Sequence, residues 1–395
     1  MSFISIKKVN TFLILGVILF FVSCQKKGCT DATASNYDAD AKKNDNSCVY
    51  GNNSTDFDKQ GLLINLTENY IIPATSNYKK EVITLDSCVE AFTLQPSIQG
   101  LSDLRNIWVN TLLSWQDISF LDFGPADYIL LKKQTNVFPA DTVLIDGNIS
   151  SGSWNLEYTN NFDAKGFQAL DYLINKRGLT ETERLTFLTG TQNSIDYLNA
   201  ITDDLLNNIN YVCDDWATYK DEFKNDFETT SQGSSISILI NAMCLHYEFY
   251  IRRGKIGLPL GVFNGFSQLE MPELVECYHY GSSLPFAIRS VESLQKYING
   301  IHYSSSQNGI GLDDYMNFVN ATSNSENLSA VVNSQIDDIV IKLNNLNDPF
   351  SSELLNNKTQ VQTTYESMQN LVPYVKVDMT SALGVLITYA DNDGD

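Results

Sequence analysis

The sequence predicts an all-α protein built from two antiparallel helical bundles, and three observations support this. Apolar residues recur every three or four positions through most of residues 97–371, which is the period of one helix face. Helix start and stop signals flank several of these stretches. Strand-like alternation is scarce: residues 143–145 and 385–389 are the two candidates, and the second could equally be an extended tail.

The first predicted amphipathic helix covers residues 101–118. Its apolar positions, spaced three or four apart, are Leu101, Leu104, Trp108, Leu112, Trp115 and Ile118. Side chains at this spacing share one face of a helix, so we expect them to face the core. Ser97 or Ser102 could cap the helix, because a serine oxygen can accept a hydrogen bond from the free N–H groups of the first turn.

Further helices are expected along the rest of the body. Acidic residues after Thr180 suit the first turn of a helix that keeps its period to Trp216. The stretch from Ser234 to Arg253 is followed by Gly254, a residue that commonly ends helices. The same period returns over residues 283–299, 311–320, 325–345 and 359–371.

Length and charge limit the organisation and the class of protein. With about 55 residues set aside for a signal and tether, the remaining 340 or so suggest two domains. We place these bundles at residues 58–212 and 213–395, because the chain changes character near residues 212–234. The net charge of −21 argues against nucleic acid, since phosphate contacts need Lys and Arg, and against a basic helix lying on a membrane.

The N-terminus has the three zones of a secretory signal. A short basic zone is followed by the apolar run of residues 11–22 and then by Ser23 and Cys24. The apolar run is shorter than the roughly 20 residues that a spanning helix needs. Residues 21–24, Phe-Val-Ser-Cys, resemble the lipobox of bacterial lipoproteins, with Phe where that family usually has Leu.

The lipobox resemblance implies that the signal, residues 1–23, is removed and that Cys24 becomes the lipidated first residue. Several acyl chains bury many methylene groups, at roughly 0.8 kcal/mol each, so such an anchor is stable. We therefore expect a protein of the cell envelope, tethered to a membrane through Cys24 in the periplasm, at the outer membrane or on the cell surface. A plain signal anchor with an incidental cysteine is the alternative.

Residues 24–57 form a polar spacer between the tether and the helical body. From Cys29 to Cys48 it resembles a short Asp-rich module (CTDxxAxNYDxxA…CxY) of many secreted Bacteroidetes-type proteins. The two cysteines bracket this module, and we expect a disulfide between them, which the compartment permits. Calcium could bind its Asp oxygens, although no complete EF-hand loop is present. A free thiol and a bridge remain equally open for Cys88, Cys213, Cys244 and Cys277.

Five segments of the body, taken together, carry a family resemblance. They are residues 104–125 (Arg-x-x-Trp, Trp-Gln and Phe-Gly-Pro), 163–173, 253–278, 309–314 and 377–395. In this order they resemble the imelysin-like family, which includes the iron-regulated protein A group and proteins once described as insulin-cleaving membrane proteases. The resemblance covers residues 58–395 and implies two helical bundles with a functional site where they meet.

The signature of this family is Gly-x-His-x-x-Glu, and the corresponding residues here are Gly166, Gln168 and Asp171. An imidazole and a carboxylate at i and i+3 share a helix face and can bind one transition metal, such as zinc or iron. Gln is a weak neutral ligand by comparison. Asp171 is the one metal ligand we assign, for iron or another divalent cation. We assign no catalytic residue, because this pair is poorly equipped to generate a metal-bound hydroxide.

Gln168 and Asp171 leave three roles open. They could hold a hard cation with help from elsewhere, or hydrogen-bond an organic ligand. They could also hydrogen-bond across the interface of the two bundles, with Asp171 paired to Arg105 or Arg252. The three histidines, His246, His279 and His302, form no His-Glu-x-x-His zinc motif.

The resemblance favours a non-enzymatic binding lipoprotein that handles iron, haem or another nutrient beside an uptake system such as a TonB-type receptor. Its ligand site would lie between the bundles, with an aromatic wall, polar groups and charges. The residues expected there are Arg105, Trp115, Gln116, Gly166, Gln168, Asp171 and Arg252. A metallopeptidase of the imelysin type is the first alternative, and a surface scaffold without a small ligand is the second.

Overall fold

The structure is a computed structural model that describes residues 26–28, 30, 37–44 and 56–390. It divides into two compact units, Met1–Phe57 and Asp58–Asp395. In the first unit, the described strands β1 (Lys27–Gly28) and β2 (Lys43–Asn44) pair in parallel. The signal segment, Cys24, Cys29 and Cys48 lie outside the described residues, so the tether and the disulfide stay predictions. Within the described residues, no helix combines the length and apolar character needed to span a membrane.

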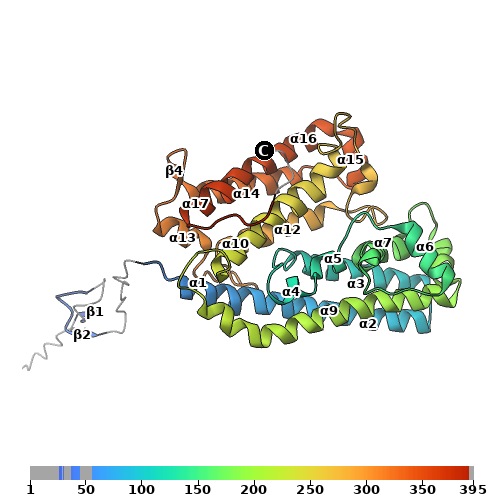
Figure 1. Cartoon of the computed structure of the whole chain (residues 1–395), viewed down its shortest axis with the longest axis horizontal. Coiled ribbons are helices and arrows are strands. Elements are labelled where there is room, and N and C mark those ends of the chain that lie inside the picture. The colour runs from blue at the N-terminus through green and yellow to red at the C-terminus, as the bar shows by residue number, and fades with distance from the viewer. Residues whose placement is uncertain (1–25, 29, 31–36, 45–55, 391–395) are drawn as a thin grey trace, which may run out of the picture. The chain divides into compact units, whose positions relative to one another are not determined.

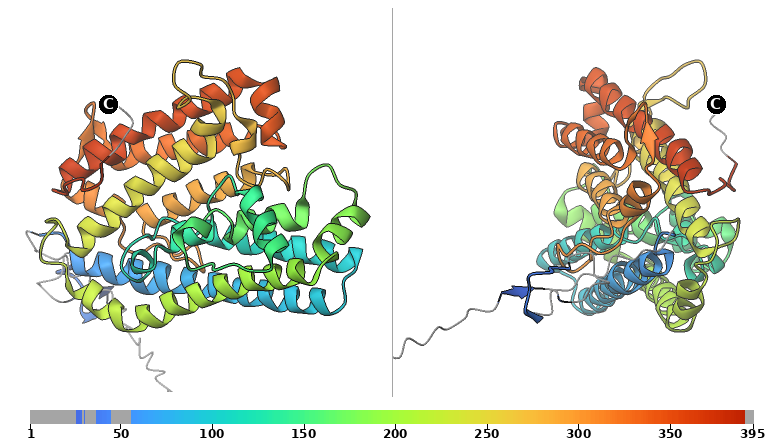
Figure 2. Two further views of the ribbon diagram at one scale, coloured as in Figure 1. Left: turned by 45° about the vertical axis from the view of Figure 1, so that its right-hand side comes forward. Right: turned by 90° about the vertical axis from the view of Figure 1, so that its left-hand side faces the viewer.

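The second unit is all-α, as predicted, and its helices form two tiers (Figures 1 and 2). The N-terminal tier, blue to green, contains α1 (Lys59–Asn65), α2 (Ile72–Leu94), α3 (Ile98–Gln116), α4 (Pro125–Tyr128), α5 (Leu131–Thr135), α6 (Thr142–Ser151), α7 (Gly166–Asn175), α8 (Glu181–Thr189) and α9 (Gln192–Asn225). A π-helical turn, Leu66–Ile71, joins α1 to α2. The long helix α2 packs against both α3 and α9.

The C-terminal tier is drawn yellow to red in Figure 1. Its helices are α10 (Ser235–Leu245), α11 (Leu258–Leu260), α12 (Leu284–Ile298), α13 (Leu312–Phe318), α14 (Leu328–Asn344), α15 (Phe350–Asn356), α16 (Lys358–Pro373) and α17 (Thr380–Ala382). Two π-helical segments, His246–Gly257 and Tyr374–Met379, interrupt it. The short strands β3 (Thr322–Ser323) and β4 (Glu326–Asn327) form an antiparallel pair. Helix α14 packs between α12 and α16, and α12 contacts α3 of the other tier.

Helix α3 follows the predicted pattern because its apolar face meets the core. Leu101, Leu104, Trp108 and Leu112 are all buried. Ser97 is the cap, since its hydroxyl accepts a hydrogen bond from the Gly100 N–H at 3.0 Å. Ser102 lies inside the helix. The sequence pattern did not decide between the two serines, and the hydrogen bond to Gly100 identifies Ser97 as the cap.

Two expectations about element boundaries differ from the structure, and one open choice is settled. Residues 143–145 are helical rather than extended, because the Asp141 carboxylate accepts from the Val143 and Leu144 N–H groups and starts α6 there. Residues 385–389 have no regular secondary structure, which agrees with the extended tail rather than the strand. The expected boundary between residues 212 and 213 falls inside α9, which continues to Asn225, and residues 58–395 form one compact unit.

The prediction that Gly254 ends a helix is wrong. The chain continues from α10 through the π-helical segment His246–Gly257 into α11. The helical run stops at Gly261, which has φ 86° and donates its N–H to the Leu258 carbonyl. A left-handed residue after the last turn is the usual helix terminator, and glycine adopts it without steric cost. A glycine does end this helical run, but it lies seven residues after the predicted one.

Helix α7 is buried along its whole length. It contacts α3, α8 and α9. Its first residue, Gly166, has φ 71°, and a Cβ atom there would lie 2.2 Å from the Thr135 carbonyl oxygen. Only glycine permits this left-handed conformation together with so close an approach of another backbone. Gly166 therefore allows α7 to start directly against the end of α5.

We predict that Gly166→Ala destabilises the protein by about 3 kcal/mol or more, from left-handed strain and a clash with backbone that cannot move aside. Denaturant unfolding measures the free energy. Gly147→Ala is the matched control: Gly147 lies inside α6, and a Cβ atom there meets nothing within 4 Å. This control should gain up to about 1 kcal/mol, because alanine favours helix. If the two substitutions changed the free energy of unfolding equally, the close backbone contact assigned to Gly166 would be wrong.

Candidate functional site

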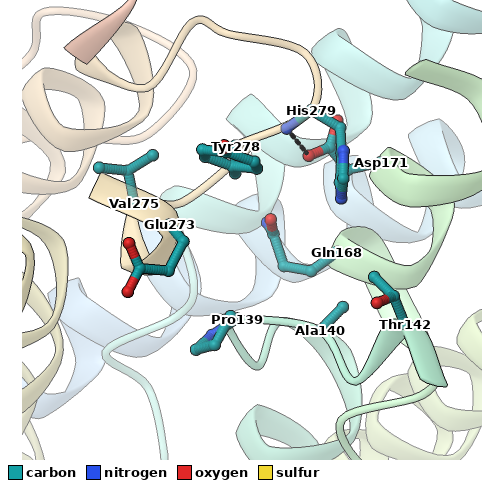
Figure 3. Close-up of a pocket in the computed structure, with 9 residues that line it drawn as sticks. All are labelled: Pro139, Ala140, Thr142, Gln168, Asp171, Glu273, Val275, Tyr278 and His279. Atoms are coloured by element: carbon teal, nitrogen blue, oxygen red, sulfur yellow. Dashed lines mark hydrogen bonds between the residues drawn. The ribbon is translucent and has the colours of Figure 1, made fainter. Parts of the chain in front are cut away.

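The residues aligned with the family signature lie on one face of α7, as their i, i+3 spacing predicts. Figure 3 shows Gln168 and Asp171 directed toward the segment from Val275 to His279, which belongs to the C-terminal tier. Cys277 in this segment has φ 57°, a left-handed conformation rare for a residue with a side chain. The site is therefore a contact between a helix of one tier and an irregular backbone segment of the other.

Gln168 uses both ends of its amide in protein contacts. Its oxygen accepts the Cys277 N–H at 2.8 Å. Its nitrogen donates to Asn136 Oδ1 at 2.8 Å and lies 3.6 Å from the Cys277 sulfur. The side chain is 3% exposed. Of the three roles considered for Gln168, the structure favours hydrogen bonding across the interface.

Asp171 accepts backbone hydrogen bonds with both carboxylate oxygens. Oδ2 accepts the His279 N–H at 2.9 Å, and Oδ1 accepts the Tyr280 N–H at 2.8 Å and the Asn175 amide at 3.0 Å. Burial raises the pKa of Asp171 to about 7, and these three donors oppose the rise. Asp171 consequently changes charge near neutral pH while it holds the backbone of the neighbouring tier.

A buried polar network extends from this pair. Glu276 Oε1 accepts the amides of Asn136 at 2.7 Å and Gln116 at 3.2 Å. Its other oxygen forms an ion pair with Lys255. Gln116 in turn accepts the Ser290 hydroxyl at 2.7 Å. Because Asn136 also binds Gln168, the network connects the signature position on α7 with α3, α12 and the π-helical segment.

Three predicted ligand-binding residues lie elsewhere. Trp115 packs against the Tyr78 ring in the core, with 5.4 Å between ring centroids. Arg105 donates to the Ile174 carbonyl and pairs with Glu181 at 2.6 Å.

Arg252 hydrogen-bonds Tyr365 at 3.3 Å and also Gln369, and its guanidinium lies 3.9 Å from Glu248. Neither arginine pairs with Asp171, which corrects that alternative. The physical reason is that backbone N–H groups already bind the Asp171 oxygens, while each arginine is bonded to other acceptors.

A cavity of about 280 Å³ opens beside the pair, and we call it the α7 cavity. It is lined by Pro139, Ala140, Thr142, Gln168, Asp171, Glu273, Val275, Tyr278 and His279. Of the predicted site residues, Gln168 and Asp171 line it, whereas Arg105, Trp115, Gln116, Gly166 and Arg252 do not. The segment from Pro272 to Tyr278 carried a family motif in the sequence, and that was the signal for part of this lining.

His279 is the one histidine that lines the α7 cavity. Its Nδ1 accepts the Arg177 N–H at 3.4 Å, and its ring lies 5.1 Å from that of Tyr172. Burial lowers the pKa of His279 to about 4, with further lowering by Lys176 and Arg177. The imidazole is therefore neutral at physiological pH. His246 is buried elsewhere, stacked on Tyr250 and bonded to Ser119.

The donor set does not fit the metal that a Gly-x-His-x-x-Glu pattern implies. A transition-metal ligand needs a free lone pair directed at the ion. The Gln168 oxygen and Asp171 Oδ2 each accept one N–H group, and Asp171 Oδ1 accepts two, so a metal would compete with these hydrogen bonds. Across the described residues, no three His, Cys, Asp or Glu side chains gather closely enough to hold a metal. The pair therefore acts as a backbone clamp.

The structure answers the question about the four cysteines of the helical body, but not the question about calcium in the spacer. Cys88, Cys213, Cys244 and Cys277 are free thiols, which settles the choice between thiol and bridge for these four. In the spacer, Asp38 forms an ion pair with Lys26 at 2.8 Å. Calcium binding by the spacer stays a prediction, because two of the four aspartates in its Asp-rich module that could supply oxygen ligands, Asp31 and Asp45, lie outside the described residues.

The chain is similar to known proteins in both sequence and fold. The family model described as imelysin, peptidase M75, matches residues 71–373. The structure of an iron-regulated protein A precursor from Parabacteroides distasonis superposes with a TM-score of 0.68 at 16% identity, covering 82% of this chain and 95% of that one. An imelysin-like protein from Psychrobacter arcticum gives 0.63 at 14% identity, covering 84% and 97%. A search among curated proteins found no match.

We predict that the stabilising contribution of Asp171 depends on pH. Its folded pKa of about 7 exceeds the ordinary value of 3.8, so this contribution is complete below about pH 4 and is lost as the pH rises through 7. The difference in unfolding free energy between wild type and Asp171→Asn should fall between pH 4 and 8 by an amount on the order of 4 kcal/mol.

Denaturant unfolding at several pH values measures this difference. Asp214→Asn, at an exposed position of α9, is the control for loss of one carboxylate. A difference for Asp171→Asn that stays constant with pH would show that its carboxyl titrates in the folded protein as it does in the unfolded chain.

Proposed function

This chain belongs to the imelysin family, and we propose that it is a non-enzymatic binding protein of the cell envelope whose ligand occupies the α7 cavity. The observation that carries the proposal is that the Gln168 oxygen and both Asp171 oxygens already accept backbone N–H groups of residues 277–280. A hydrolytic metal centre needs ligands with free lone pairs and an open position for water. A binding site needs only a shaped cavity with a few oriented polar groups.

The lining of the α7 cavity suits a small organic ligand. Val275, Pro139 and Ala140 provide apolar surface, and Tyr278 adds an aromatic ring. Glu273 and Thr142 supply polar groups at its wall. The volume of about 280 Å³ is at the lower end of the range for ligand pockets, which favours a compact ligand or one edge of a larger one.

Iron is the nutrient that we connect with this cavity. One similar structure is described as an iron-regulated protein A precursor. Because the described residues gather no three-ligand metal cluster, we expect iron to arrive within an organic carrier, as a chelate or as haem, and other nutrients remain open to the same test. Tyr278 and His279 line the cavity, and both residue types can be axial ligands to haem iron.

The expected test is a thermal-shift screen of the purified protein against haem, ferric citrate and ferric ion alone. A ligand at about 100 times its Kd stabilises the folded state by about 2.7 kcal/mol. Ala140→Trp should abolish the shift by filling the α7 cavity, whereas Ala91→Trp, on the exposed face of α2, should preserve it. If no compound shifts the transition, the scaffold function gains support.

A metallopeptidase is the second candidate, because the matching family model is designated a peptidase. Metal analysis of protein purified without chelators separates the two functions. We expect far less than one zinc per chain and no proteolysis. Stoichiometric zinc that disappears together with proteolysis in Asp171→Ala would overturn the binding function.

Attachment through Cys24 is the second part of the proposal, and it would keep the protein beside an uptake receptor of the TonB type. Radiolabelled palmitate should label the wild-type protein in bacteria, since lipid attachment needs the lipobox cysteine. Cys24→Ser should lose both the label and the membrane fraction, whereas Cys88→Ser, which removes a free thiol of α2, should retain them. An unlabelled wild-type protein in the membrane fraction would support a plain signal anchor.

A further inference from the structure

A second cavity, of about 340 Å³, lies at the Phe-Gly-Pro motif of residues 123–125. It is lined by Asp122, Phe123, Gly124, Asp127, Tyr128, Tyr219, Ile238, Asn241, Ala242, Leu245, Thr388 and Tyr389. These residues come from α4 and the turn before it, from α9, from α10 and from the segment after α17. None of them lines the α7 cavity. We call this second space the α4 cavity.

Aromatic rings form much of the wall of the α4 cavity. Phe123, Tyr128, Tyr219 and Tyr389 contribute to the lining. The rings of Tyr128 and Tyr219 stand 6.5 Å apart at 70°, so they form a corner. The negative face of an aromatic ring attracts cations, and several rings around one space form the cages that recognise alkylated ammonium groups.

Gly124 positions one wall of this corner. It has φ 52°, and a Cβ atom there would lie 2.4 Å from Cε1 of Tyr219. Glycine therefore lets the Tyr219 ring lie directly against the backbone before α4. Tyr219 also packs on Trp216, with 5.2 Å between centroids. The ring is held on two sides, and the Phe-Gly-Pro motif thus acquires a structural role in shaping the cavity.

The charged groups of the lining are two carboxylates, Asp122 and Asp127, and the lining contains no Lys, Arg or His. Asp122 pairs with Lys132 at 3.1 Å, and that ammonium lies 4.3 Å from the centroid of the Tyr250 ring. Asp127 forms no side-chain hydrogen bond or ion pair with any other described residue. Partial burial and the neighbouring Asp122 raise its pKa, and the charges of Lys132 and Lys133 only partly oppose this rise. A cation beside Asp127 would relieve the repulsion between the two carboxylates.

The chain after α17 closes one side of the α4 cavity. The Asn241 amide donates to the Leu386 carbonyl at 2.9 Å and accepts the Thr388 N–H at 2.8 Å. The Tyr389 hydroxyl donates to Glu248 at 3.0 Å. These bonds fix Thr388 and Tyr389 as a wall, so the cavity exists before any ligand arrives and binding requires little ordering.

We propose that the α4 cavity binds a small organic cation, an alkylated ammonium group that fits against Tyr128 and Tyr219 with Asp127 as counter-charge. This site goes beyond the proposed function and does not depend on it. An inorganic cation suits it less well, because hard metal ions need several oxygen ligands, whereas rings and one unpaired carboxylate suit a weakly hydrated organic cation.

The test uses isothermal titration of the full-length protein with choline and with its uncharged isostere, 3,3-dimethylbutanol. Choline should bind saturably and at least about 10-fold more tightly than the isostere, the scale of a partly desolvated cation–π and ionic contact. Its affinity should also fall as the salt concentration rises. Equal binding of both compounds, or no binding of either, would overturn the proposal.

Variants separate the proposed contacts from general stability. Tyr128→Leu keeps apolar volume and removes one ring, and Asp127→Asn removes the charge at constant shape; each should weaken choline binding by about 5-fold or more. Tyr158→Leu is the matched control, because Tyr158 is as exposed as Tyr128, at 63%, and lies outside the cavity. Unchanged affinity in both cavity variants would contradict the site. Ala140→Trp fills the α7 cavity and should leave choline binding intact. This variant therefore separates ligand binding in the α4 cavity from ligand binding in the α7 cavity.

Discussion

The hydrogen bonds from the backbone of residues 277–280 to two side chains of α7 are the constraint on which the rest of the site depends. Gln168 and Asp171 accept three N–H groups from this segment, which has no regular secondary structure to satisfy them. A buried N–H without a partner costs about 1 to 3 kcal/mol. The two tiers of helices are therefore held in one register, and the Glu276 network and the α7 cavity take their positions from that register.

The fold was largely predictable because most helices of this chain have one buried and one exposed face. Helix α3 shows that pattern, and its apolar positions were identified from sequence spacing. Helix α7 is buried on every side, so polarity does not alternate around it and the family motif was the signal for its importance. Gly254 misled the prediction because a π-helical segment accommodates it, and local sequence does not distinguish a π turn from a helix end.

The site was predictable in part. Gln168 and Asp171 were found through the family motif, and Gln116 joins them through Asn136 and Glu276. Arg105 and Trp115 were expected beside the ligand, but their partners come from distant parts of the chain and no spacing rule reveals them. The lining of the α7 cavity combines residues 139–142 with residues 273–279. Only the tertiary fold brings these irregular segments together.

The clamp on α7 also restricts how this sequence can change over evolutionary time. A histidine at position 168 would leave the Cys277 N–H without the acceptor it has now, and the carboxylate at position 171 would still be occupied by backbone. A metal-binding and a backbone-binding version of the motif are therefore separated by intermediates with a poorly satisfied core. Substitutions at these two positions are epistatic with the path of residues 277–280, so the two versions exchange only if side chains and loop change together.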